Sequence, residues 1–199
     1  MIHRATPADH DTVVAILARA FTDDPIVSWL FPDPTTRAHL QTELYYAPLL
    51  THPSVETDLV AEAGAAIWLR LATGQPPYGD GPTSPPYRNE PAELPAAAHR
   101  LQALGEALAQ RHPHDQPYLY LPCMGVAAAH RGAGIGSTML RDRLRYADSL
   151  AIGTYLEASS PRSRALYLRH GFRDQGSPVQ VADSPTLWPM WRPTTGDKR

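Results

Sequence analysis

The chain has 199 residues, a formal charge of −2 at pH 7, 43% hydrophobic residues and 19% charged residues. These fractions are typical of globular proteins and exclude a fibrous or wholly disordered chain. The length suits one well-cored domain, and the near-neutral charge gives no support for nucleic acid as a partner.

Cysteine use and hydropathy bear on the compartment. Cys123 is the only cysteine, so an internal disulfide is impossible and secretion gains no support. No apolar run reaches the ~18 residues that a membrane helix needs, and the first residues lack an apolar signal core. We therefore expect a cytoplasmic protein with no membrane partner.

The first fifty residues carry helix signals. Thr6 is suited to cap a helix and Pro7 to occupy its first turn, and the apolar residues that follow recur at helical spacing. Aspartate and proline interrupt the pattern at 23–25 and again at 32–34. The predicted elements are a strand at 2–5 and helices at 6–22, 26–31 and 36–50.

The pattern changes in the middle of the chain. Residues 55–61 and 65–71 are predicted strands joined by a turn at 62–64, which indicates a hairpin. The segment 74–95 holds seven prolines and should form no regular element. It is either an exposed loop or a lid over an acceptor site. A helix is predicted at 95–111.

The remaining segments alternate between strand and helix patterns, which predicts a mixed α/β sheet protein. No internal repeat and no domain boundary is evident, so residues 1–199 are expected to form a single domain. The predicted elements here are a strand at 118–126, a glycine-rich loop, a helix at 136–150, a strand at 154–159, a helix at 161–170, and strands at 178–181 and 186–192.

The glycine-rich loop, Arg131–Gly136, lies between an apolar strand and an amphipathic helix. Glycines let backbone N–H groups turn inward, and a helix N-terminus adds partial positive charge, so this pattern favours a pyrophosphate site. A P-loop is excluded because Ser137, not Lys, follows Gly136. A dinucleotide fingerprint fits poorly because the glycines alternate, but Glu157 stands at roughly the ribose-acid distance. That alternative and a purely structural turn remain open.

Two motifs together resemble the GNAT superfamily of N-acetyltransferases. Arg131-x-x-Gly134-x-Gly136, preceded by Gly125-Val126 and followed by Ser137, looks like the superfamily's acetyl-CoA motif. Residues 156–172 look like its second signature, in which a strand leads to a helix bearing a tyrosine and then to Gly-Phe. The resemblance covers about 55 residues, and the predicted elements on either side follow the family's order. It implies a GNAT fold, with a mixed, largely antiparallel sheet of about six to seven strands flanked by helices.

The resemblance also implies a cofactor site. Backbone groups of the strand before the loop would bind the pantetheine arm and polarise the thioester, and the loop would hold the pyrophosphate. Ser160 stands where many relatives have Asn. The residues expected to bind acetyl-CoA are Met124, Gly125, Val126, Arg131, Gly132, Ala133, Gly134, Ile135, Gly136, Ser137, Ser160 and Tyr167.

Tyr167 is the candidate general acid, because a phenol with a pKa near 10 is protonated at neutral pH and can donate to the departing thiolate. The alternative for Tyr167 is a place in the core. Glu157 is the candidate general base, directly or through water, or else a structural carboxylate. Tyr120, Glu43 and Tyr46 remain open as the base, and an amine that loses its proton to water needs no dedicated base.

Two further residue types receive simpler interpretations. Histidines 112 and 114 flank a proline, but zinc needs more ligands than this neighbourhood offers, so no metal is expected. Cys123 is expected to pack as a small apolar side chain.

The predicted function is transfer of an acetyl group from acetyl-CoA to the primary amine of a small molecule, such as an antibiotic or a biosynthetic intermediate. The alternatives are a protein or peptide N-acetyltransferase and a non-catalytic acyl-CoA-binding sensor. Residues 20–30, the helix before Tyr118 and the tail Trp188–Trp191 are similar to puromycin N-acetyltransferase-like proteins. Because dimers are frequent in the family, a homodimer is possible.

Overall fold

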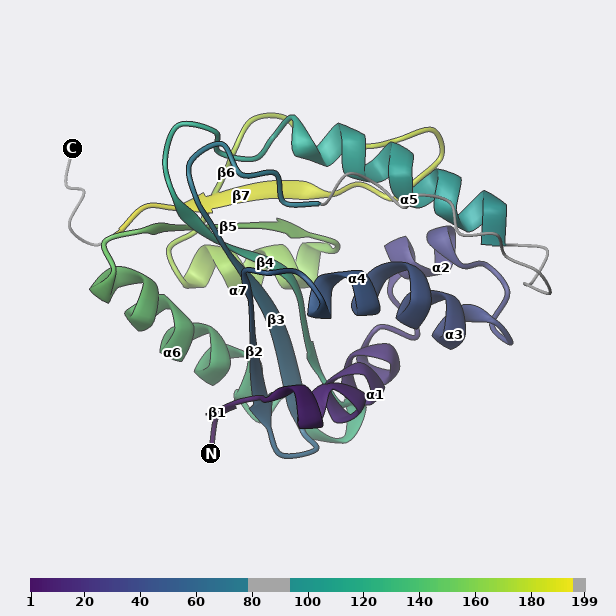
Figure 1. Ribbon diagram of the computed structural model, residues 1–199, viewed down its shortest axis with the longest axis horizontal. Coiled ribbons are helices and arrows are strands. Elements are labelled where there is room, and N and C mark those ends of the chain that lie inside the picture. Colours follow the sequence, from purple (N-terminus) through teal and green to yellow (C-terminus); the bar gives the residue numbers. More distant parts are fainter. Residues whose placement is uncertain (79–93, 195–199) are drawn as a thin grey trace.

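The computed structural model describes residues 1–78 and 94–194, so most of the proline-rich segment predicted at 74–95 lies outside the described residues. The described chain forms one seven-stranded sheet in the order β1-β2-β3-β4-β5-β7-β6, flanked by helices (Figure 1). Every neighbouring pair is antiparallel except β4 and β5, which are parallel. The predicted mixed, largely antiparallel α/β sheet is therefore confirmed.

In chain order the elements are β1 (His3–Arg4), the 3₁₀ turn η1 (Pro7–Asp9), α1 (His10–Ala20), α2 (Pro25–Leu30), α3 (Arg37–Gln41), the π-helical segment η2 (Thr42–Tyr46), α4 (Ala47–Leu50), β2 (Val55–Val60), β3 (Gly64–Leu71), α5 (Leu94–Ala109), β4 (Tyr118–Val126), the 3₁₀ turn η3 (Ala128–His130), α6 (Ile135–Ser149), β5 (Gly153–Ala158), α7 (Pro161–Arg169), β6 (Arg173–Asp174) and β7 (Trp188–Arg192).

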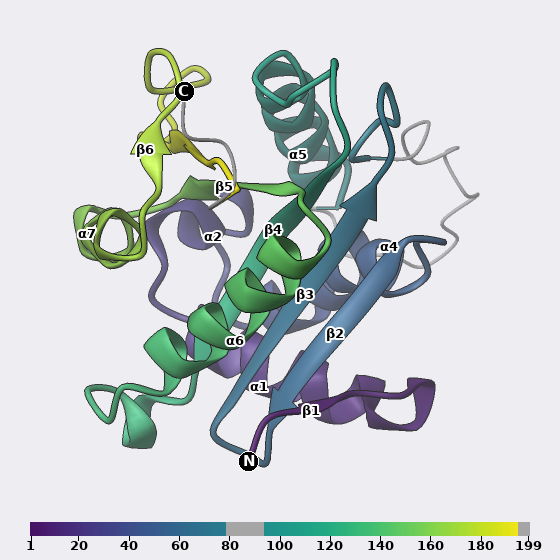
Figure 2. The same ribbon diagram turned by 90° about the vertical axis from the view of Figure 1, so that its left-hand side faces the viewer.

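The sheet has two covered faces, because successive strand side chains point to opposite sides. On one face Tyr118, Tyr120 and Tyr155 pack with residues of α1, η2 and α4. On the other face Leu119 and Leu156 pack with residues of α6 and α7. Figure 2 shows α6 in front of the sheet and α1 behind it. A third apolar cluster joins α2 to α5 at one end of the sheet.

The structure corrects two of the predicted elements. Residues 178–181 do not form a strand; Val179 makes only an isolated bridge to Leu187, and the short edge strand β6 lies earlier, at Arg173–Asp174. The predicted helix at 36–50 is helical throughout but is interrupted by the π-helical η2. A π-helical stretch adds a residue to the turn, a geometry that apolar periodicity does not reveal.

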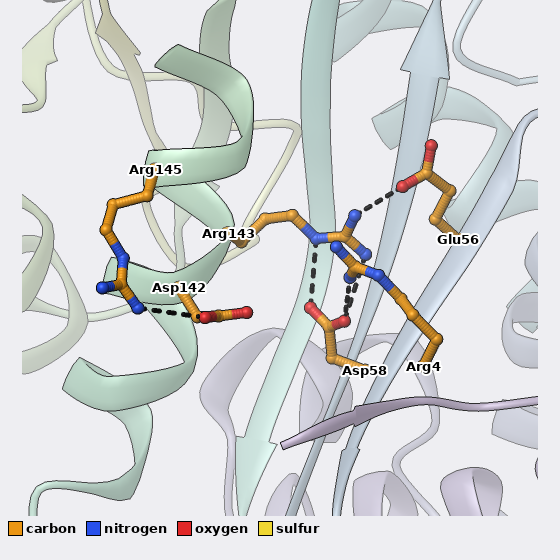
Figure 3. Close-up of polar contacts among 6 residues, drawn as sticks. All are labelled: Arg4, Glu56, Asp58, Asp142, Arg143 and Arg145. Atoms are coloured by element: carbon orange, nitrogen blue, oxygen red, sulfur yellow. Dashed lines mark hydrogen bonds and ion pairs between the residues drawn. The ribbon is translucent and has the colours of Figure 1, made fainter. Parts of the chain in front are cut away.

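A buried ion cluster lies on the face covered by α6 (Figure 3). The fully buried Arg143 of α6 donates from Nε and Nη2 to the Asp58 carboxylate, at 3.1 and 3.2 Å, and also pairs with Glu56. Arg4 of β1 pairs with Asp58. The Arg143 guanidinium also lies 5.4 Å from the Trp68 ring centroid. We call Arg4, Glu56, Asp58 and Arg143 the α6 ion cluster; its two cations and two carboxylates compensate one another.

In the part of the chain that the structure describes, no helix has the length and apolar character required to cross a membrane.

Candidate active site

Strands β4 and β5 separate halfway along their length. Their parallel pairing ends with Leu121 opposite Leu156, although β4 continues to Val126. Pro122 follows the last paired residue and has no backbone N–H to donate to a neighbouring strand. The Tyr45 hydroxyl donates to the Pro122 carbonyl oxygen, 3.0 Å away. The second half of β4 is therefore hydrogen-bonded to β3 on one side only, and its other edge borders a cleft.

The glycine-rich loop lies at the end of this free edge. Gly132 and Gly134 have φ values of +87° and +76°, which L side chains rarely adopt. A Cβ added at either residue would meet nothing within 4 Å, and both residues line the cleft. Gly134 caps α6, a helix of 15 residues whose first turn contains no acidic side chain. The unpaired N–H groups and partial positive charge of this helix end favour an anion.

Basic side chains border the same part of the cleft. Arg131, predicted to contact a phosphate, lines the cleft but donates from Nη2 to Ala20 O at 2.7 Å, and so ties the loop to α1. His130, Arg162 and Arg169 also line the cleft. The cleft is therefore positive where the glycine-rich loop and α7 meet.

Helix α7 presents Tyr167 to the cleft. Its ring packs against Phe172, with centroids 5.7 Å apart, and the side chain is only 7% exposed. Burial, with smaller contributions from Cys123 and Asp24, raises the pKa of Tyr167 above its usual value of 10.0. The Tyr167 hydroxyl makes no hydrogen bond among residues 1–78 and 94–194. Tyr167 therefore packs in the core and also reaches the cleft as a protonated phenol, and its role as the general acid stays a prediction.

Two serines at the end of β5 fix neighbouring helices. Ser160 is the N-cap of α7, and its Oγ accepts from the Ser163 N–H at 3.1 Å. Ser159 donates to Asp24 Oδ2 at 2.7 Å, and Asp24 Oδ1 caps α2 through the Ile26 N–H at 2.9 Å. These bonds hold α2 beside the end of β5.

A second buried polar cluster is centred on Glu157, whose side chain is 6% exposed. Its Oε2 accepts from the Tyr120 hydroxyl at 3.0 Å, and that hydroxyl lies 2.8 Å from the Tyr78 hydroxyl. Its Oε1 lies 3.1 Å from Nε2 of the fully buried His112, whose Nδ1 lies 2.8 Å from the Tyr118 hydroxyl. We call these five residues the Glu157 network. Glu157, Tyr120 and Tyr78 line the cleft, and His112 and Tyr118 lie behind them.

The phenols of this network hold their protons firmly. Burial raises the pKa of Tyr78 and Tyr120 well above 10.0, and the nearby Glu157 charge raises it further. Burial raises the pKa of Tyr118 and Tyr155 in the same way. The Glu157 carboxylate and the His112 imidazole are the remaining ionisable groups of the network.

The cleft has a volume of about 1470 Å³ and extends from the glycine-rich loop to α2, η2 and α5. Near these three elements its wall is mainly apolar, with Ile26, Leu30, Tyr45, Leu101 and Leu104 among the lining residues. Among the described residues, the carboxylates that line the cleft are Asp23, Asp24, Glu43, Glu106 and Glu157. The cleft is thus basic at one end and apolar with acidic groups at the other.

The structure gathers almost all of the predicted site residues around this cleft. Of the predicted catalytic and cofactor-binding residues, only Ala133 is not part of its lining. Tyr46, left open as a base, is buried and its hydroxyl accepts from Gln41. Glu43 lines the cleft but is exposed. Cys123 is free and buried, as predicted, and burial raises the pKa of its thiol to about 12.

Sequence reasoning missed the contact between His112 and Glu157. It considered His112 only as a metal ligand, and the described residues hold no cluster of His, Cys, Asp and Glu that would bind a metal. Three tyrosines and Glu157 alternate along β4 and β5, which was a signal that they share one face of the sheet. No local pattern indicates that a residue in the turn before β4 reaches that face.

Comparisons with known proteins agree with this geometry. The family model described as "Acetyltransferase (GNAT) family" matches residues 66–172, more than half of the chain. A solved structure of histone acetyltransferase HPA2 and related acetyltransferase from Corynebacterium glutamicum is 25% identical, with a TM-score of 0.63 and coverage of 100% of this chain and 98% of that one.

More distant structures share the fold. Arylalkylamine N-acetyltransferase 2 from Aedes aegypti is 12% identical, with a TM-score of 0.59 and coverage of 97% of this chain and 98% of that one. The C-terminal condensation domain of Ebony, solved in complex with beta-alanyl-dopamine, is 13% identical, with a TM-score of 0.63 and coverage of 98% of both chains. At these identities the likeness concerns the fold alone.

Proposed function

Since the chain belongs to the GNAT family of acetyltransferases, we propose that it moves an acetyl group from acetyl-CoA to the primary amine of a small molecule. The observation that carries the proposal is the separation of β4 from β5 beside the glycine-rich loop and the start of α6. One cleft thereby contains free backbone groups, an anion site, a protonated phenol and a carboxylate. Direct transfer between two bound substrates requires these groups together.

The residues of the loop fit the phosphates of coenzyme A. The open space beside Gly132 and Gly134 would admit an anion, and the first turn of α6 would donate N–H groups to it. Arg131, Ser137 and Ser160 border the same space. When bound, acetyl-CoA supplies an acetyl group already activated as a thioester. The free edge of β4 at Met124, Gly125 and Val126 would bind the pantetheine arm and polarise the thioester carbonyl.

Tyr167 and Glu157 have complementary proton-transfer roles in this proposal. The Tyr167 phenol is protonated at neutral pH and has no competing hydrogen bond among the described residues, so it donates a proton to the departing sulfur. Glu157 accepts a proton from the amine on the cleft side of its network. The amine becomes a nucleophile only after this proton is removed, because an ammonium nitrogen has no lone pair.

The other end of the cleft favours an apolar amine. Its walls bury apolar surface, its carboxylates attract a cationic amine, and the basic lining residues lie mainly at the loop end. An acceptor with a carboxylate beside its amine would meet Glu157 and Asp24 with a like charge. We therefore propose an aryl or alkyl amine without such a carboxylate, a class that includes aminonucleoside antibiotics and the amines of biosynthetic intermediates.

A second candidate is a protein or peptide amine. It is favoured by the 25% identity to a structure whose name includes a histone acetyltransferase, and by acidic residues such as Glu43 and Glu106 that border the cleft and are exposed. A basic peptide would fit those residues, whereas the apolar wall formed by Leu30, Tyr45 and Leu104 would remain unused. This wall makes the small amine the preferred proposal.

The test measures thiol release from acetyl-CoA with amines offered in matched pairs: phenylethylamine against phenylalanine, tyramine against tyrosine, and an aminonucleoside against a lysine-rich peptide. Release that depends on the amines lacking a carboxylate, with a product heavier by one acetyl group, supports the proposal. Preference for the peptide would replace it with the second candidate. Binding of acetyl-CoA without turnover of any amine indicates a sensor, and absence of binding contradicts the proposed function.

A further inference from the structure

Two members of the Glu157 network lie behind the others and do not line the cleft. His112 and Tyr118 are fully or almost fully buried, and neither lines the cleft. They therefore cannot meet either substrate, although His112 Nε2 lies 3.1 Å from Glu157 Oε1. The two atoms form an ion-pair contact rather than a hydrogen bond of full geometry, and neither has a hydrogen-bond partner among the described residues. Each is the polar partner available to the other, in a place where an unpartnered charge is costly.

The surroundings leave Glu157 dependent on this partner. The titratable groups that face Glu157 are His112 from the turn before β4, Tyr118 and Tyr120 from β4, Tyr155 from β5, Tyr45 from η2, and Tyr78 from the segment after β3. The tyrosines are held protonated and carry no charge. Among the described residues, no Arg or Lys forms an ion pair with Glu157. The imidazole is therefore the group that can offset the carboxylate charge.

We propose that His112 is a positioning residue that keeps Glu157 ionised and correctly oriented as the base, an inference that rests on the proposed function. The Tyr118 hydroxyl, 2.8 Å from Nδ1, donates to that nitrogen and so directs the Nε2 proton toward Glu157 Oε1. Oε2 is then the oxygen on the cleft side, already paired with the Tyr120 hydroxyl.

The proton balance follows from this arrangement. As the amine loses one proton to the Tyr120 oxygen, the proton of the Tyr120 hydroxyl moves to Glu157 Oε2. The tyrosine is unchanged, the amine becomes neutral, and Glu157 gains one proton, which it later releases to solvent by the same route. Because burial raises the pKa of Tyr120 well above 10.0, no tyrosinate accumulates. His112 gains and loses no proton in this step. Its N–H instead sets the pH above which Glu157 is available to accept a proton.

The test compares two substitutions of His112 in the full chain. His112→Leu retains most of the volume and removes the N–H, so the acid limb of the kcat/KM profile moves to higher pH by about one unit, and activity below that limb falls about tenfold. His112→Gln places an amide N–H near the former Nε2 and returns the limb to within a few tenths of a unit of wild type. Tyr118→Phe, which keeps the ring, moves the limb in the same direction by a smaller amount.

The background variant Glu157→Gln supplies the control. Its carboxylate is gone, so adding His112→Leu changes its pH profile no further if His112 acts through Glu157. Wild-type pH profiles for His112→Leu and Tyr118→Phe would overturn the inference, as would a His112→Gln profile identical to that of His112→Leu. Wild-type enzyme that releases no thiol with any amine would instead overturn the proposed function, so the two failures are distinguishable.

Discussion

The sheet carries one buried polar cluster on each face, and the two differ in how their charge is compensated. The α6 ion cluster pairs two arginines with two carboxylates, and Arg143 also lies over the Trp68 ring. The Glu157 network has a single carboxylate among phenols and one imidazole, and three of its members line the cleft. The charges of the first cluster compensate one another, whereas the second holds the carboxylate that we propose as the base.

Burial alone does not distinguish a carboxylate that could take part in a reaction from one that only stabilises the fold. Asp58 and Glu157 are similarly buried, with side chains 2% and 6% exposed. Asp58 contacts two guanidinium groups, whose permanent positive charges compensate its carboxylate. Glu157 instead contacts a phenol and an imidazole, and it lies at the edge of the cleft. Charge compensation and access to the cleft, rather than depth of burial, therefore distinguish the structural Asp58 from the proposed base Glu157.

The largest expected effect is a loss of stability when the α6 ion cluster is broken. Arg143→Met leaves Asp58 and Glu56 short of one cation in a buried setting, so the free energy of unfolding should fall by about 3–5 kcal/mol. Activity per folded molecule should stay close to wild type, because this cluster lies on the opposite face of the sheet from the Glu157 network. Urea unfolding followed by circular dichroism, with kcat measured at a stabilising temperature, checks both parts.

Arg145→Met is the matched control for that experiment. Arg145 is on the same helix, pairs with Asp142 and is 79% exposed (Figure 3). Because exposed ion pairs contribute little, its unfolding free energy should change by no more than about 0.5 kcal/mol. Equal losses for the two variants would mean that helix α6 tolerates neither change, and that burial of Arg143 is not what matters.

The next expected effect is a change in turnover that leaves the stability of the fold nearly unchanged. Tyr167→Phe removes a hydroxyl that has no hydrogen bond among the described residues, so unfolding should be nearly unchanged. If Tyr167 is the acid, kcat falls ~10²-fold, with little change in the affinity for acetyl-CoA. Steady-state kinetics and calorimetric titration of coenzyme A measure the two quantities. Wild-type turnover would remove Tyr167 from the mechanism and leave it a core residue beside Phe172.

The sequence predicted Glu157 and the glycine-rich loop, but it did not predict the side-chain pairings within either cluster. Glu157 was found because a known motif includes its strand, and the cleft-lining loop because glycines at 132, 134 and 136 are unusual. The ion pair of Arg143 with Asp58 and the contact of His112 with Glu157 join residues that are 85 and 45 positions apart. Such pairings depend on strand register and helix placement, which no local pattern encodes.

Misplaced elements have local physical causes. The segment 178–181 alternates like a strand, but prolines at 178 and 185 and the left-handed Ala182, with a φ of +50°, prevent a continuous ladder. The π-helical η2 breaks the period of a helix that was otherwise correctly predicted, and it contains the Tyr45 whose hydroxyl bonds Pro122. Tertiary contacts thus determine the details at the places where the cleft is built.

A smaller effect should separate cofactor binding from stability at the loop. Gly136 lies in the first turn of α6, and a Cβ there would come no closer than 3.6 Å to Val126. Gly136→Ala should therefore raise the unfolding free energy by about 0.5–1 kcal/mol. The added methyl borders the cleft, so the KM for acetyl-CoA should rise about tenfold, or ~1.4 kcal/mol. A stabilised variant with an unchanged KM would make this glycine a structural residue only.

The smallest expected effect concerns Ser160. This residue either serves only as a helix cap or also borders the bound cofactor. As the N-cap of α7 it accepts from the Ser163 N–H, so Ser160→Ala should lower the unfolding free energy by about 1 kcal/mol. Ser160→Asp keeps a capping oxygen and should restore this stability, but it adds a negative charge where phosphates are proposed to lie. If Ser160 borders bound coenzyme A, Ser160→Asp raises the KM for acetyl-CoA more than Ser160→Ala does. Equal KM values for both variants would assign Ser160 to the helix cap alone, and would move the anion site toward the glycine-rich loop.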